Sequence, residues 1–191
     1  MIRLTLAGAA VATIAVLAGC ATMTKAECEA GDWRSVGMAD GSNGRPLAYL
    51  DQHNAACADH GIPVNRQLYE AGRNDGLRVY CRLDRAEREG REGRTYYNVC
   101  TGDVGVGFNR VYLDAKAIHD IDRQVTSTRR ELDALLDEMV IPGLSGDRLT
   151  RLRAEIRIAQ NALNRLERDR SAAERRLALT RRQEEERLAQ G

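Results

Sequence analysis

The chain has 191 residues, of which 29 are basic and 28 acidic, so its formal net charge is only +1. This balance argues against a nucleic-acid-binding surface, which requires a clear excess of positive charge. The length suits one modest domain with an extension, and 43% of the residues are hydrophobic, enough to form a core.

The N-terminus has the pattern of a secretory signal. Arg3 precedes an apolar run from Leu4 to Leu17, and small residues lead to Cys20. The stretch Leu17-Ala18-Gly19-Cys20 resembles a bacterial lipobox, in which the cysteine thiol receives a lipid and the peptide is cut before the cysteine. We therefore predict a signal peptide over residues 1–19 and lipidation at Cys20.

An uncleaved transmembrane anchor is the alternative interpretation of this segment. The apolar run is about 15 residues long, shorter than the roughly 20 that span a bilayer, which favours cleavage. By resemblance to known sorting signals, an aspartate after the lipidated cysteine would favour the inner membrane, and here Ala21 follows. The predicted location is the bacterial cell envelope, with the protein anchored by lipid in the outer membrane and facing the periplasm.

Four further cysteines predict two disulfides, because an even number in an exported chain is typical of a disulfide framework. They are Cys28, Cys57, Cys81 and Cys100. No two of them form a Cys-x-x-Cys pair, so a zinc site is not expected. Spacing alone leaves all three pairings open.

A geometric argument favours the pairs Cys28–Cys57 and Cys81–Cys100. If residues 46–60 and 64–79 are helices joined by a turn, Cys57 lies near the turn and Cys81 at the far end of the second helix. The two would then be roughly 25 Å apart, which makes Cys57–Cys81 the least expected pair.

Residues 20–110 are predicted to form a disulfide-stapled head, rich in glycine and aromatic residues. Its two expected helices carry apolar stripes and are separated by the breaker Gly61-Ile62-Pro63. Glycines recur near aromatic residues in the segments 33–41, 69–81 and 90–100. Aromatic rings packed over glycines would give a small head a core, with Trp33 inside it.

Residues 111–191 are predicted to form a long antiparallel helical hairpin, or coiled coil, so the fold class is mostly α. Apolar residues at steps of three and four run from Ile118 to Met139 and again from Leu149 to Leu177. Pro142-Gly143 interrupts the pattern, and Asp147 is the expected N-cap of the second helix. An intermolecular coiled coil is the alternative. At roughly 40 residues the second helix would extend about 60 Å and reach back to the head.

The hairpin is also the predicted contact for an envelope protein partner, because a long helical surface with mixed charges suits selective pairing. The candidate residues, either in the hairpin seam or in docking, are Ile118, Val125, Leu132, Ile156, Leu163 and Arg170. Arg170 occupies an apolar heptad position, where it would set the register at some cost in stability.

The polar and glycine-rich motifs have ordinary structural interpretations. The segment from Gly102 to Gly107 lacks the Lys-Ser/Thr of a phosphate-binding loop, so we interpret it as a turn leading into the long helix.

The three histidines are expected to lie in solvent or at helix ends and to bind no metal. They are His53, His60 and His119.

Three aspartates beside glycines are expected to cap turns, and an acid/base pair is the alternative. These are Asp32, Asp40 and Asp103. No catalytic residue, cofactor or metal is therefore predicted.

Four motifs occur in the order in which they are found in one group of bacterial proteins, which this chain therefore resembles. They are Glu27-Cys28 with Gly31-Asp32-Trp33, Gly37-x-x-Asp40-Gly41-x-x-Gly44, the segment from Tyr69 to Cys81, and Gly90-x-x-Gly93-x-x-Tyr96-Tyr97-x-x-Cys100. The group is the small envelope lipoproteins with domain of unknown function 2799, and the resemblance covers about residues 26–112. It implies an envelope location and disulfides, but no activity.

We expect a cell-envelope lipoprotein that is not an enzyme and acts as a structural or protein-interaction module. One alternative is a peptidoglycan-linked enzyme or enzyme activator with Asp40 or Asp103 in its site. Another is an envelope module that senses stress or a small ligand through the head.

Overall fold

The computed structural model describes residues 22–190, so the predicted signal peptide and Cys20 lie outside the described part of the chain. Within residues 22–190 the chain forms helices and no strand, which confirms the mostly α prediction. The helices in chain order are α1 (Lys25–Ala30), α2 (Trp33–Ser42), α3 (Tyr49–Ala58), α4 (Arg66–Tyr80), α5 (Leu83–Arg91), α6 (Gly102–Met139) and α7 (Gly146–Ala189).

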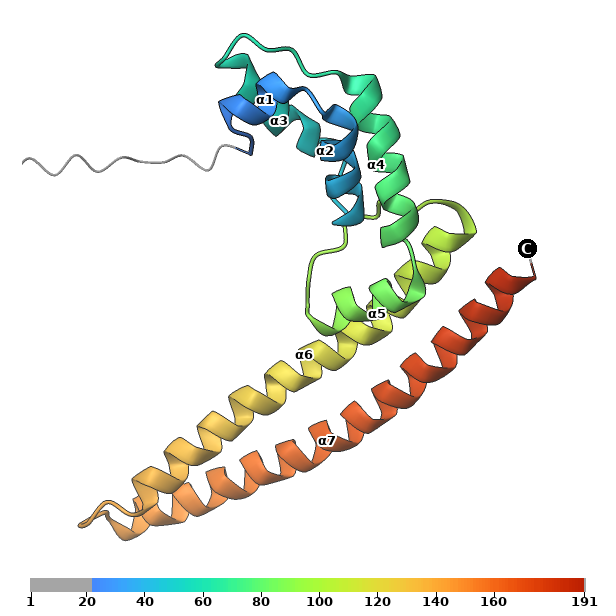
Figure 1. The fold of residues 1–191 in the computed structure, drawn as a ribbon. Coiled ribbons are helices and arrows are strands. Elements are labelled where there is room, and N and C mark those ends of the chain that lie inside the picture. The colour runs from blue at the N-terminus through green and yellow to red at the C-terminus, as the bar shows by residue number, and fades with distance from the viewer. Residues whose placement is uncertain (1–21, 191) are drawn as a thin grey trace, which may run out of the picture.

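The helices form two parts. Helices α1 to α4 cluster together, and α5 lies along the first half of α6, which pairs with α7 in a long hairpin (Figure 1). The end of α7 returns to the level at which α6 begins. No helix among the described residues is long and apolar enough to cross a membrane.

The first part is built around one disulfide and two large aromatic side chains. Cys28 in α1 and Cys57 in α3 are bonded, with their Cα atoms 5.6 Å apart. Trp33 and Tyr69 are buried beside this disulfide, together with Leu50. Trp33 is therefore a core residue, as predicted.

Four glycines allow α2 and α4 to pack with their backbones in contact. Gly37 and Gly41 lie one turn apart on α2, and Gly72 and Gly76 lie one turn apart on α4. A Cβ atom at any of these positions would overlap a backbone carbonyl of the facing helix. Backbone atoms cannot swing aside as side-chain ends can, so this helix pair requires glycine at all four positions.

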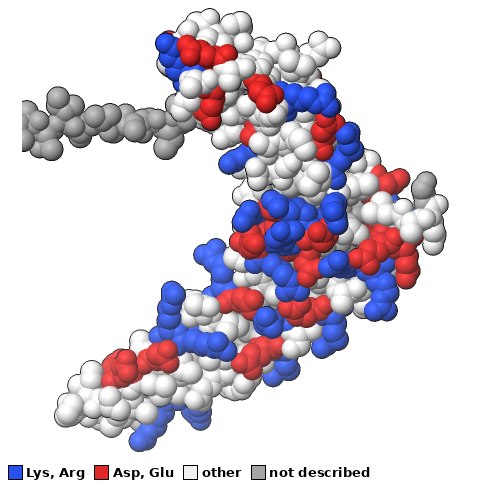
Figure 2. All heavy atoms as spheres, viewed as in Figure 1, with Lys and Arg blue, Asp and Glu red and all other residues white. Residues whose placement is uncertain are grey.

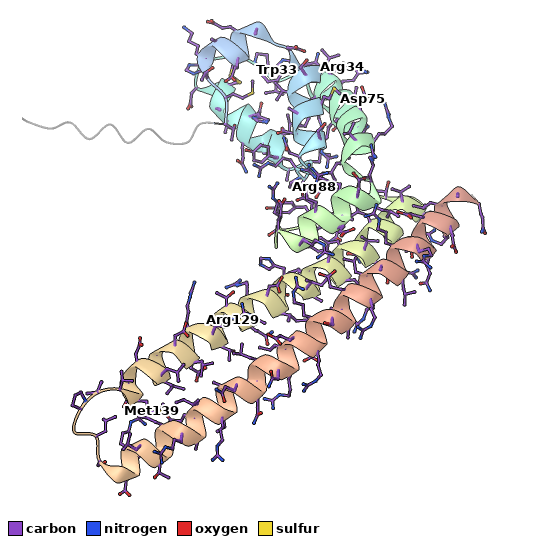
Figure 3. All side chains as sticks on the ribbon, turned by 60° about the horizontal axis from the view of Figure 1, so that its bottom comes forward. Trp33, Arg34, Asp75, Arg88, Arg129 and Met139 are labelled. Carbon is purple, nitrogen blue, oxygen red and sulfur yellow. A yellow bond between two sulfur atoms is a disulfide. The ribbon has the colours of Figure 1, made fainter. Side chains whose placement is uncertain are left out.

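A salt bridge joins the same two helices at their surface. Arg34 of α2 binds Asp75 of α4, and the two side chains lie next to each other in Figure 3. The expected contact of aromatic rings with glycines is present at Gly44, which packs against the ring of Tyr80. The closest glycine contacts in this part, however, are between backbones.

The second part has an aromatic core at the start of α6. The ring centroids of Tyr80 and Phe108 are 5.2 Å apart, and those of Tyr96 and Phe108 are 4.6 Å apart. Ala173 and Leu177 of α7 close this core from the other side. Tyr80 is the last residue of α4, so its buried side chain attaches the first part of the fold to the core of the second.

The second disulfide lies at the same place. Cys81, directly after α4, is bonded to Cys100, two residues before α6, with a Cα–Cα distance of 5.6 Å. The structure thus contains the two disulfides that the sequence favours. Two contacts, one aromatic and one covalent, connect the end of α4 to the start of α6.

The long hairpin is formed by α6 and α7 of the same chain. Helix α6 has 38 residues and α7 has 44, so α7 extends about 66 Å at 1.5 Å per residue. The hairpin seam includes Val125 of α6 and Leu152 and Ala159 of α7, all buried. The second helix is longer than the first and reaches back to the head, as predicted.

Two predictions at helix starts are wrong. Gly102–Gly107 is not a turn before the long helix but its beginning, so the predicted boundary between residues 110 and 111 falls inside α6. The N-cap of α7 is Ser145, whose hydroxyl accepts a hydrogen bond from the backbone N–H of Arg148 at 3.2 Å, and Asp147 lies in the first turn. A serine hydroxyl two positions earlier caps a helix as well as a carboxylate does, and the order of the residues alone does not show which of the two is the N-cap.

We predict that Gly72→Ala will destabilise the folded protein by about 1–3 kcal/mol, because the added methyl group must push two helix backbones apart. Gly146→Ala is the matched control, since nothing lies within 4 Å of a Cβ at that helical position. Guanidinium unfolding of the oxidised protein measures both. Equal midpoints for the two variants would contradict the backbone contact.

Candidate functional site

The first described residues are tied into the head by buried contacts. Thr22 lies two positions after Cys20, and its Oγ1 is 3.0 Å from Nδ1 of His53. Met23, the next residue, is buried in the core of the first part. Thr24 and Glu27 then form a capping box at the start of α1. The chain is therefore fixed to the head from Thr22 onward.

His53 is the centre of a polar network inside the head. Its Nε2 lies 2.8 Å from Oδ2 of Asp40, and the hydroxyl of Tyr69 donates to the same oxygen at 2.7 Å. Because a carboxylate oxygen accepts, Nε2 carries the proton and Nδ1 of a neutral ring accepts from the Thr22 hydroxyl. The network thus links the N-terminal segment to α2, α3 and α4.

Two members of this network are buried, and Thr22 and Asp40 are half-buried. His53 is 4% exposed and Tyr69 is fully buried. Burial, reinforced by the hydrogen bond to Asp40, raises the pKa of Tyr69 well above its ordinary value. The expectation that His53 lies in solvent or at a helix end is therefore wrong. Its place on the apolar stripe with Leu50 and Cys57 was the signal in the sequence that indicated burial.

The three aspartates have separate structural roles. Asp32 caps α2 by accepting from the backbone N–H of Ser35 at 3.2 Å, and hydrogen bonding by the side chain and then the backbone of Ser35 lowers the pKa of Asp32. Asp40 belongs to the buried network, and Asp103 accepts from Arg187 at 3.1 Å. Each of the three aspartates thus has a hydrogen-bond partner within the described part of the chain.

The glycine-rich start of α6 is explained by packing. At Gly105 a Cβ atom would overlap the carbonyl of Cys100, so glycine lets the helix start directly beside the disulfide. At Gly107 a Cβ atom would lie 3.1 Å from Oε2 of Glu184 and 3.3 Å from the guanidinium of Arg187. Glycine therefore leaves space for two charged groups of α7.

Glu184 is the centre of an ion-pair cluster that sequence analysis missed. It is 2% exposed, and its carboxylate accepts from Arg110 of α6 and Arg187 of α7, both at 2.7 Å. Burial alone would raise the pKa of Glu184, but the hydrogen bonds from the two arginines outweigh it, and the pKa is lowered. This cluster fastens the end of α7 to the start of α6. A glutamate beyond the last apolar heptad position gave no signal for burial.

The other histidines do not converge with His53. The Nδ1–H of His119 donates to the carbonyl of Arg91 at 3.0 Å, and its ring packs on Gly93. His60 is exposed in the turn after α3. In residues 22–190, no group of three or more His, Cys, Asp or Glu side chains is arranged to hold a metal ion.

The predicted hairpin residues lie in or beside the intramolecular seam. Ile118, Val125 and Ile156 are buried, and Leu132 and Leu163 are half-buried. Ile118 and Val125 are enclosed in the seam, whereas Ile156 also lines a hollow at the surface, so a docking surface on the hairpin needs exposed side chains besides these three.

Arg170 differs from the other predicted hairpin residues because its side chain is exposed. It donates to Asp122 of α6 at 2.7 Å and approaches Glu174 of α7 at 3.8 Å. The first pair crosses the hairpin, which agrees with a role in setting its register.

Comparison with known proteins gives one match. Residues 32–117 match the family described as Protein of unknown function (DUF2799), which confirms the resemblance seen in the motifs. The match includes α2 to α5 and the first part of α6, and so contains the glycine contacts and the Cys81–Cys100 disulfide. No curated protein and no solved structure matches the chain.

We predict that Asp40→Asn will lower the free energy of unfolding by about 1–3 kcal/mol, because a neutral amide oxygen accepts the hydrogen bonds from His53 and Tyr69 more weakly than a charged carboxylate does. Asp169→Asn, at an exposed position, should leave it unchanged. Urea unfolding of the two oxidised variants checks this. A fully stable Asp40→Asn protein would contradict a structural role for the network.

We predict that the stabilising effect of Glu184 depends on pH. Because its pKa is lower when folded, its contribution is fully present above the unfolded value near 4.5 and is lost as pH falls through the folded pKa. Glu184→Gln should lower the melting temperature by about 2–4 °C at pH 7 and by much less at pH 3. Thermal melts of wild type, Glu184→Gln and the exposed control Glu186→Gln test this. An equal deficit at both pH values would contradict it.

Proposed function

We propose that this chain, whose residues 32–117 belong to the DUF2799 family, is a lipid-anchored envelope protein that holds a rigid helical arm away from the membrane as a protein-interaction surface. In this proposal the lipid is attached to Cys20, the head lies at the outer membrane, and the hairpin projects into the periplasm. No chemical step is assigned to the protein.

The attachment of the N-terminal segment supports a head held close to the membrane. Thr22 is fixed by His53, and Met23 is buried in the head. Cys20 precedes Thr22 by two residues, a span of about 7 Å at most in an extended chain. A lipid on Cys20 would thus hold the head against the bilayer without a long linker.

The continuity of α6 is the observation that carries the interaction role. This helix begins beside the Cys81–Cys100 disulfide, contributes Phe108 and Ile118 to the core of the second part, and continues without a break to Met139. Because α6 is one unbroken helix, the arm cannot bend where it leaves this core. A rigid arm of this length presents its side chains at a defined distance from the anchor.

Disulfides in both parts also support an exported protein. The bond Cys28–Cys57 lies in the first part of the fold, and the bond Cys81–Cys100 joins the end of α4 to the segment before α6. Disulfides persist in the oxidising compartments outside the cytoplasm and are rare inside it. An envelope location agrees with this chemistry.

We predict that the processed wild-type protein will be acylated and recovered in the membrane fraction, and that Cys20→Ser will abolish acylation and release the chain from membranes. Mass spectrometry of the N-terminal peptide and cell fractionation measure these results. Unacylated wild-type chain in the cytosol, with its thiols free to alkylation, would contradict the proposal.

The arm is tested in cells with a photocrosslinking residue at Ile158 or Leu179, which are 66% and 56% exposed. Met38 in the head, 47% exposed, is the matched control. The proposal predicts a discrete protein adduct from an arm position and none from the control. Adducts from the head alone would contradict an interaction role for the arm.

A further inference from the structure

Two segments of the outer hairpin carry the same pattern with opposite charge. On α6 it is Asp133, Leu136 and Asp137, and on α7 it is Arg153, Ile156 and Arg157. In each segment an apolar residue lies three positions after the first charge and one before the second. This spacing places all three side chains on one side of their helix.

The four charged residues of this pattern are free to bind a partner. All four are exposed, and none forms an ion pair or a side-chain hydrogen bond with another described residue. Neighbouring charges are paired within the chain, for example Glu138 with Arg148 at 2.5 Å. Figure 2 shows acidic atoms near the tip on the α6 side, with basic atoms beside them, and basic atoms projecting along the α7 edge.

The two segments lie at the same height of the hairpin. The pairs Arg129–Glu167 and Glu138–Arg148 cross from α6 to α7 and fix the register on either side. Asp133 lies about midway between the first members of these pairs, and Arg157 about midway between their partners. Asp137 and Arg153 each lie one turn nearer the tip.

The two segments also border one face. Met139, at the outer end of α6 in Figure 3, lines a hollow of about 470 Å³ together with Arg153, Ile156 and Arg157. Leu136 lies three residues before Met139, on the same side of α6, and is 39% exposed. The face therefore has an acidic edge on α6, an apolar centre with a hollow, and a basic edge on α7.

We propose that this face binds the same face of a second copy of the chain, related by a two-fold axis along the length of the hairpin. Such an axis places α6 of each copy over α7 of the other at equal height. Asp133 then meets Arg157 and Asp137 meets Arg153, twice over, because a two-fold contact repeats each pair. Leu136 of each copy is placed over the hollow beside Ile156.

The parallel orientation agrees with anchoring in one membrane. A two-fold axis along the hairpin leaves both heads at the same end, where two lipid anchors would enter the same bilayer. This inference names the partner of the arm and so rests on the proposed interaction role, although the contact itself does not require the lipid. Confinement to one membrane would raise the effective concentration of the two copies.

A second copy fits this face better than an anionic lipid surface. Asp133 and Asp137 form one edge of the face and would be repelled by anionic headgroups. A surface with equal numbers of both charges, arranged in opposite order on its two edges, is complementary to itself.

The test uses charge reversal in the full-length protein, purified in detergent and measured by sedimentation equilibrium. Wild type should form a dimer. Asp133→Arg/Asp137→Arg and Arg153→Asp/Arg157→Asp each oppose like charges and should weaken dimerisation about ten-fold or more. Combining all four substitutions restores opposite charges and should restore the dimer.

Circular dichroism spectra show whether the variants fold, and the helix content of wild type is expected because the four side chains make no ion pair with another described residue. A monomeric wild type at every concentration, or dimers that persist in both two-site variants, would overturn the proposal. A fourfold variant that folds but remains monomeric would do the same. None of these results bears on acylation at Cys20, so failure of the dimer is distinguishable from failure of the proposed function.

Discussion

The arrangement of the whole molecule depends on how the end of α4 is held at the start of α6. Tyr80 is buried against Phe108, and the next residue, Cys81, is bonded to Cys100. These are the principal links from the α2–α4 helix pair to the arm. A ring stacked in an apolar core and an adjacent covalent bond together leave little freedom of rotation at this joint. The direction of the arm relative to α1–α4 follows from this joint.

The small size of the head explains its use of glycine. Short helices of six to fifteen residues cannot each bury a wide apolar stripe. Backbone contact between α2 and α4 replaces that stripe, because closely packed backbones gain dispersion energy without large side chains. The buried His53 network and the Cys28–Cys57 disulfide then fasten α1 and α3 around the helix pair. The head is thus held by glycine contacts, one polar network and one covalent bond.

The sequence predicts the features that depend on regular spacing. Heptads from Ile118 to Met139 and from Leu149 to Leu177 identified the hairpin, and the helix break at Gly61-Ile62-Pro63 separates α3 from α4. The mostly α fold class and the favoured disulfide pairs agree with the structure.

Features that depend on what lies opposite a residue were not predictable. The glycines of α2 and α4 indicate close packing, but only the fold shows that they face each other. Burial of His53 and Glu184 follows from partners 13 and 74 residues away in the sequence, Asp40 and Arg110. The start of α6 at Gly102 was missed because glycine is a poor helix former, and here packing against Cys100 outweighs that preference.

The central claim is that the joint at Tyr80 and Cys81 fixes the arm to the head. Pulsed electron paramagnetic resonance between spin labels at Arg66 in α4 and Val140 at the hairpin tip measures this directly, with labels attached by chemistry that spares the thiols. The account predicts a single narrow distance distribution in the oxidised protein. A broad distribution, spread over many tip positions, would show that the arm swings on the head and would contradict it.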